Sequence, residues 1–228
     1  MKVLLLFLLT YCCRSHAQDS STFIIKAGTS FNESVPIAEI YQYSQFVMGK
    51  VYFKSGDSTT AKLNHHKFLD QMQFIDLKGD TLNIANAPTI RFIHINNDIF
   101  YYDEGWIRQI SDINGIKLAI KQTLRILEKN KVGGYGTASP TSAIDSYGVL
   151  IDQKGMYNLT PREDVTLTKK TQYYFGNKYN EFFGATRKNL LRQFSKQSRT
   201  LDTYLKDNDV DLNKREDLEK LLQFLADL

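Results

Sequence analysis

Residues 46–110 alternate short apolar runs with clusters of turn residues, a pattern typical of β-strands joined by hairpins. The runs carry β-branched and aromatic side chains. The gaps carry Gly, Asn and Asp, which supply the positive φ angles of tight turns. These gaps are too short for crossover helices, so we expect neighbouring strands to pair antiparallel. The expected strands cover residues 46–53, 59–64, 71–77, 89–95 and 99–102.

Residues 116–127 alternate between apolar and polar side chains. The apolar side chains at even positions are Ile116, Leu118, Ile120, Leu124 and Ile126. A period of two favours a long half-buried strand, although a helix would also gather positions 116, 120, 124 and 127 on one face. Residues 165–175, rich in Thr, Val and Tyr, are the expected hairpin partner. Glycine and serine over 132–146 predict a flexible connection between the two strands.

Beyond residue 176 the apolar period becomes helical. Thr186 can cap a helix that carries Leu190 and Leu191, and a second helix is expected around Leu201 and Leu205. Asn213 and Glu216 have capping-box spacing ahead of a third helix. We therefore predict an α+β fold. An antiparallel β-rich domain covers residues 18–175, and a C-terminal segment of about three short helices covers residues 176–228.

The first 17 residues have the layout of a cleavable secretory signal. Met1 and Lys2 form a basic start, residues 3–10 are almost wholly apolar, and Ser15 and Ala17 are small residues ahead of Gln18. The apolar run is too short to span a bilayer, and no later segment approaches the roughly 20 apolar residues that a spanning helix needs. We expect residues 1–17 to be removed and the rest to be periplasmic, envelope-associated or secreted, with no transmembrane segment.

Export changes the meaning of the composition. Cys12 and Cys13 are the only cysteines, and both lie in the expected signal, so the processed chain would have no disulfide and no thiolate ligand. Loss of Lys2 and Arg14 would halve the formal charge of +4. A nearly neutral exported chain gives no case for nucleic acid as a partner.

Three stretches of the chain are motifs of turns and helix starts. They are residues 49–56 (GKVYFKSG), residues 72–74 with 78–82 (MQF and KGDTL), and residues 174–176 leading into 188–191 (YFG and KNLL). Together they resemble a group of uncharacterised exported proteins of Gram-negative bacteria, and the resemblance covers most of the chain after residue 17. It implies an envelope location. The group has no established activity, so the resemblance implies no catalytic residue.

Asp103 and Glu104 are adjacent carboxylates just ahead of Trp106, the only tryptophan. Aromatic rings beside carboxylates are common in carbohydrate sites, and glycosidases use two carboxylates about 5–10 Å apart across a cleft. The same residues also fit a turn in which Trp106 anchors the core. A hydrolase of envelope polysaccharide or peptide is therefore the alternative function.

Basic residues recur at every fourth position from 117 to 129. Lys117, Lys121, Arg125 and Lys129 would lie on one face of a strand and near one face of a helix. Residues 176–199 also hold six basic residues against one acidic residue, whereas residues 200–228 hold four against eight. Such patterns arise from solvated faces or from docking. The candidate partners are an anionic envelope surface or another envelope protein.

Metal and nucleophile motifs are weak in this chain. His65 and His66 are neighbours, and neighbouring residues on a strand point to opposite faces. Residues 207–213 match the start of a calcium loop, but Leu212 and Leu218 occupy the positions that need Gly and Glu. We expect no metal and no cofactor, and we assign no catalytic residue. The favoured function is a non-enzymatic binding or interaction module; capture of another chain along residues 172–175 is a further reading.

Overall fold

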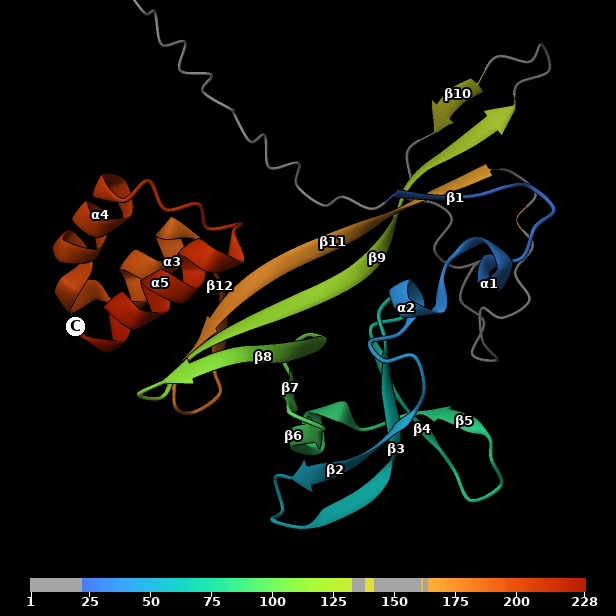
Figure 1. Cartoon of the computed structure of the whole chain (residues 1–228), viewed down its shortest axis with the longest axis horizontal. Coiled ribbons are helices and arrows are strands. Elements are labelled where there is room, and N and C mark those ends of the chain that lie inside the picture. Colours follow the sequence, from blue (N-terminus) through green and yellow to red (C-terminus); the bar gives the residue numbers. More distant parts are fainter. Residues whose placement is uncertain (1–21, 133–137, 142–160, 162–163) are drawn as a thin grey trace, which may run out of the picture.

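The computed structural model describes residues 22–132, 138–141, 161 and 164–228 (Figure 1). It is mostly antiparallel β-sheet with a few short helices, mainly C-terminal, which confirms the predicted α+β class. The strands are β1 (Thr22–Ile25), β2 (Val47–Phe53), β3 (Ser58–His66), β4 (Gln71–Ile75), β5 (Thr81–Asn83), β6 (Ile90–Ile95), β7 (Asp98–Tyr102), β8 (Trp106–Ile113), β9 (Ile116–Val132), β10 (Ala138–Thr141), β11 (Asp164–Gly176) and β12 (Phe182–Gly184). The helices are α1 (Phe31–Ser34), α2 (Ile37–Ile40), α3 (Arg187–Gln193), α4 (Ser198–Asp207) and α5 (Arg215–Ala226), with 3₁₀ turns η1 (Ala87–Thr89) and η4 (Ser195–Gln197).

One sheet runs through the described chain, with neighbours in the order β1-β11-β9-β8-β7-β6-β2-β3-β4-β5. Strand β10 pairs with β9, and β12 pairs with β11. All five strands expected between residues 46 and 102 are present and pair antiparallel, as their short connections require. In Figure 1 the long β9–β11 hairpin separates the C-terminal helices from strands β2–β5.

The period-two prediction for residues 116–127 is confirmed, because β9 is a strand and β11 is its antiparallel partner. Strand β9 is longer than expected and ends at Val132. Strand β8 pairs only with residues 116–120 of β9 and leaves the edge of the far half uncovered on that side, where the Leu124 N–H donates to Lys67 O. Residues 138–141 pair with this edge as β10, which corrects the expected loop at these positions. The rest of the predicted connection, residues 133–137 and 142–146, lies outside the described residues.

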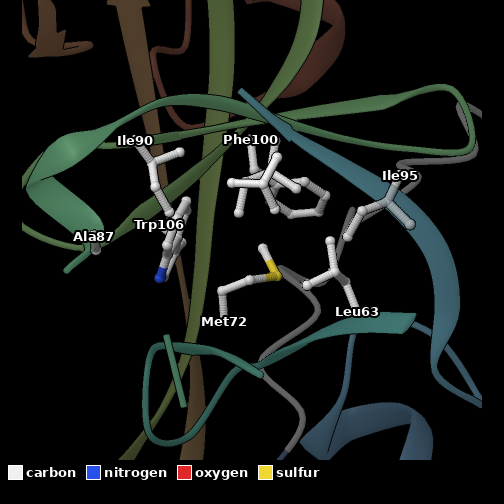
Figure 2. Packing of buried hydrophobic residues seen from close by; sticks show 9 residues of the cluster. Leu63, Met72, Ala87, Ile90, Ile95, Phe100 and Trp106 are labelled. Carbon is white, nitrogen blue, oxygen red and sulfur yellow. The ribbon is translucent and has the colours of Figure 1, made fainter. Parts of the chain in front are cut away.

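Three apolar clusters form the core. One joins α1 and α2 to β1, β9 and β11. The second fills the inside of the curled strands β2–β8, where Figure 2 shows Met72 between Trp106 and Leu63, with Phe100 beside them. The third packs α3, α4 and α5 on β9 and β11 around Leu118 and Phe175. The C-terminal helices are therefore joined to the β-sheet by their packing on one face of the β9–β11 hairpin.

Two helix starts tested the capping predictions. The Thr186 hydroxyl accepts a hydrogen bond from the Asn189 N–H, which confirms the predicted cap of α3. The capping box at Asn213 is wrong, because α5 begins after Lys214 and has no side-chain cap. The backbone N–H and the side-chain amide of Asn213 both donate to the Asp211 carboxylate. The side chain that was expected to cap α5 is therefore bonded to Asp211.

Candidate functional site

An apolar cup opens at one end of the curled strands β2–β4 and encloses about 700 Å³. Its apolar lining is Val51, Phe53, Ala61, Leu63, Phe74, Ile75, Leu77, Ile84, Ala85 and Ile90. Its polar lining is Thr59, Thr60, Lys62, Asp76, Asn86 and Thr89. Three of the apolar lining residues are buried and form an apolar floor, whereas all the polar lining residues except the half-buried Asp76 are exposed.

Strand register explains why apolar side chains converge in the cup. Val51 lies opposite Thr59, and Leu63 lies opposite Phe74, so these side chains share the inner face of the sheet. Ala61 alternates onto the same face between Thr59 and Leu63. Residues 84–90 then return from β5 to β6 and form the remaining wall. The Ile84 N–H donates to Met72 O at 2.9 Å, and the Lys54 N–H donates to Thr89 O at 2.9 Å.

The floor of the cup belongs to the second core, whereas its walls and rim remain partly open. Val51, Leu63 and Ile90 are buried, and Phe53 and Phe74 are half-buried. Leu77 at the rim is fully exposed, and Leu82 is 44% exposed and lies opposite Phe74 in the β4–β5 register. Apolar side chains that face water around a concave apolar opening are typical of a binding surface.

A second feature is a polar centre around Asp70, in the turn between β3 and β4. Asp70 Oδ2 pairs with Lys121 Nζ at 2.7 Å, and Oδ1 lies 3.2 Å from His65 Nε2. Asp70 Oδ1 also accepts the Trp106 N–H at 3.1 Å. Lys121 Nζ donates a further hydrogen bond to Glu104 O at 2.8 Å. We call these five residues the Asp70 centre; it ties β3, β9 and the β7–β8 turn together.

Gly105 is required by the Asp70 centre. Its φ of +126° lies in the region that residues with side chains rarely adopt. A Cβ at this position would lie 1.9 Å from Lys121 Nζ and 2.1 Å from Asp70 Oδ2. The missing side chain therefore lets the β7–β8 turn close directly on the ion pair.

Burial and hydrogen bonding set the charges of this centre. Burial acts to raise the pKa of Asp70, but the hydrogen bonds from His65 and Lys121 outweigh it and lower the pKa to about 2. Burial lowers the pKa of His65, against the opposing effect of Asp70. His65 is therefore neutral, and because ionised Asp70 only accepts hydrogen bonds, Nε2 is the ring nitrogen that donates. The centre holds one carboxylate, one ammonium and one neutral imidazole.

The structure brings three of the seven sequence candidates, Glu104, Trp106 and Lys121, to this centre, where their contacts are structural. Trp106 is only 2% exposed and packs in the second core, as the core-anchor interpretation predicts. Asp103 and Glu104 are exposed in the β7–β8 turn. Burial and the neighbouring Glu104 raise the pKa of Asp103. The hollow beside Trp106 measures about 10 Å³, has neither carboxylate in its lining, and has room for about one water molecule.

The basic stripe on β9 does not form one surface. Lys117 is buried, pairs with Asp112 at 3.3 Å and donates to Asn177 O at 3.3 Å. Lys121 is buried in the Asp70 centre, while Arg125 is exposed. The side chain of Lys129 lies outside the described residues. Alternation predicted that the four basic residues share one face of the strand. Both faces of β9 are covered over its first half, so Lys117 and Lys121 lie in the interior.

Two other sequence candidates have different partners from those expected. The edge is not open at Tyr174 and Phe175, because these residues pair with β9 on one side and β12 on the other, and Tyr173 O accepts the Ala185 N–H. His66 Nδ1 accepts the Leu69 N–H, and His65 contacts Asp70 instead of sharing an ion with His66. Within the described ranges, no group of three or more His, Cys, Asp or Glu residues is placed to hold a metal ion.

The cup was missed by the sequence reasoning. Alternation in residues 59–64 separates Ala61 and Leu63 from Lys62, but it does not show that the strands curl around a hollow. Ile84 follows β5 and Ile90 begins β6, and no spacing in the sequence relates either residue to the inner face of β3. None of the helices in the part of the chain described here is long and apolar enough to cross a membrane. Comparison with protein-family models, curated proteins and solved structures gave no match.

Proposed function

We propose that the protein is a non-enzymatic binding module of the cell envelope, and that its apolar cup holds the apolar body of a small ligand. The observation that carries the proposal is the cup itself, a hollow of about 700 Å³ with an apolar floor. Small-molecule sites commonly measure about 300–1,000 Å³ and carry few polar groups. Export of the chain after removal of residues 1–17 is part of the same proposal.

The charges around the cup favour a ligand whose inserted part is uncharged. Lys62 is exposed, and the Asp76 carboxylate accepts the N–H groups of Lys78 and Asp80 at 2.9 and 2.8 Å. The Asp76 carboxylate therefore stabilises the β4–β5 turn. The floor residues offer only aliphatic and aromatic surface, and burial of each ligand methylene there contributes about 0.8 kcal/mol.

The positions of the candidate carboxylates support a binding module over a hydrolase. Asp103 and Glu104 lie on an exposed turn and line neither of the two hollows described above. Lys121 is held by Asp70, and Trp106 is packed in the core, so neither is presented to a ligand. The exposed aromatic platform that a polysaccharide site needs is therefore not supplied by Trp106.

Binding of a fluorescent apolar probe to the full chain tests the proposal. The wild type should bind, and Ala61→Phe should bind about tenfold or more weakly, because the new ring occupies the inner face of the cup. Thr171→Phe adds the same side chain at an exposed position of β11 and should bind as the wild type does. Equal binding by both variants, with unchanged thermal unfolding, would place the probe elsewhere and contradict the proposal.

Export is tested separately from ligand binding. The full chain, produced in a Gram-negative host, should be recovered from the periplasmic or extracellular fraction with Gln18 as its first residue. Mass determination of the intact protein measures this directly. Recovery of the unprocessed chain from the cytoplasm would contradict export but leave the cup open to test.

A further inference from the structure

The segment that runs from α3 through η4 into the first turn of α4 carries four exposed cations. Lys188, Arg192, Lys196 and Arg199 are all exposed. No acidic residue occurs between Glu181 and Asp202 in the sequence. Among the described residues, none of these four cations lies within ion-pair distance of a carboxylate. We call these four residues the α3 basic face.

Neighbouring cations in the same helical region are neutralised. Arg187 and Lys206 both pair with Asp202. Lys214 pairs with Asp211 at 3.7 Å. Arg215 pairs with Glu219 at 2.8 Å. The four positive charges of the α3 basic face are thus uncompensated locally, although carboxylates are available to other cations nearby.

Packing fixes the orientation of this face. Lys188 and Arg192 are one turn apart on α3, so they project from the same side of the helix. Leu190 of α3 and Leu201 of α4 are fully buried in the third core. Because the apolar sides of these helices are already used, the basic side chains are held toward solvent.

We infer that the α3 basic face docks the protein onto an anionic lipid bilayer. The large hydrophobic side chains that are exposed in the described chain do not include any from residues 187–200. Protein partners are usually gripped by aromatic or aliphatic anchors at the centre of an interface, and this face has none. A cluster of cations without such anchors fits a surface of anionic headgroups, where each cation strengthens binding about fivefold. This inference does not depend on the cup.

Vesicle flotation of the full chain tests the docking face. The wild type should float with phosphatidylcholine vesicles that contain phosphatidylglycerol, and should be released as salt rises from about 0.1 M to about 0.5 M. The quadruple variant K188Q/R192Q/K196Q/R199Q should bind about 600-fold more weakly, at about fivefold for each cation. The matched variant R187Q/K206Q/K214Q/R215Q removes the same number of charges from paired cations and should keep nearly all of the binding.

Three results would overturn the inference. They are equal binding to vesicles of phosphatidylcholine alone, equal loss of binding in both quadruple variants, and binding to soluble polyglutamate without binding to vesicles. The last result would assign an acidic protein as the partner. If the first quadruple variant unfolds by circular dichroism, Lys188→Gln with Arg192→Gln provides the smaller change, with an expected loss of about 25-fold. Probe binding in the cup should be unchanged in every folded variant.

Discussion

At the scale of single residues, the contacts of the Asp70 centre were only partly visible in the sequence. Glu104 and Trp106 lie close together in the sequence and both belong to the centre, and the burial of Trp106 agrees with its interpretation as a core anchor. No spacing rule relates Asp70 to Lys121, because their contact depends on how the β3–β4 turn folds against β9. Sequence periodicity places side chains on faces but does not specify which distant charges meet.

Gly105→Ala should destabilise the protein by about 2–4 kcal/mol. The new methyl group would meet Lys121 Nζ and Asp70 Oδ2, and the backbone would keep an unfavourable positive φ. Urea unfolding, monitored by tryptophan fluorescence, measures the change in the free energy of unfolding. Gly79→Ala is the matched control, because Gly79 has a φ of +91° but open space around its Cα; its loss should be about 1 kcal/mol. Equal losses would show that the contact with the ion pair contributes nothing.

Protonation of Asp70 should lower the free energy of unfolding in acid, within a defined range of pH. The folded-state pKa of Asp70 is lowered to about 2, below its unfolded value of roughly 4. Its contribution is therefore complete above about pH 4 and is lost as the pH falls toward 2; it amounts to about 2 kcal/mol. The stability gap between the wild type and Asp70→Asn should narrow between about pH 4 and pH 2. A gap that stays constant across this window would contradict the assigned pKa.

The contribution of His66 to stability is lost at a higher pH than that of Asp70, so the two contributions can be measured separately. Burial lowers the pKa of His66 to about 4, so its unfolded state binds a proton more readily than its folded state. That contribution is complete above the unfolded pKa of about 6.5 and is lost as the pH falls toward 4. It therefore precedes the Asp70 window in an acid titration.

At the scale of elements, long periodic segments were predictable and short ones were not. Strands β2, β3, β6 and β9 follow from alternation and turn residues. Helices α1 and α2 were missed because each has only four residues, too few for a helical period to show. Strand β10 was missed because it forms on the free edge of β9, and its own sequence contains Pro140.

The two predicted caps provide a test at this scale. Thr186→Ala should destabilise the protein by about 1 kcal/mol, because the Asn189 N–H loses its acceptor at the start of α3. Asn213→Ala should change stability by less than about 0.5 kcal/mol, because Asn213 caps no helix and lies on an exposed turn. Chemical unfolding of the two variants measures the difference. A larger loss for Asn213→Ala would restore it as the cap of α5.

At the scale of the whole molecule, the α+β class follows from pattern, but the cup does not. Alternation gave the inner face of β3, whereas the hollow depends on the curl of β2–β4 and on the return of residues 84–90. The proposed binding and docking surfaces also lie on different parts of the fold. The cup belongs to β2–β4 and residues 84–90, and the α3 basic face belongs to the helices on the other side of the β9–β11 hairpin (Figure 1).

This separation predicts that the two surfaces act independently. Ala61→Phe lies in the wall of the second core and should weaken probe binding without changing salt-sensitive flotation on anionic vesicles. K188Q/R192Q/K196Q/R199Q changes only exposed side chains on the third core and should have the opposite effects. Sites that are distant and share no contacts usually contribute additively, so a protein with both sets of changes should show the two losses summed as free energies. A loss of flotation in Ala61→Phe would instead mean that the cup itself contacts the bilayer, with the exposed Leu77 at its rim as the contact residue.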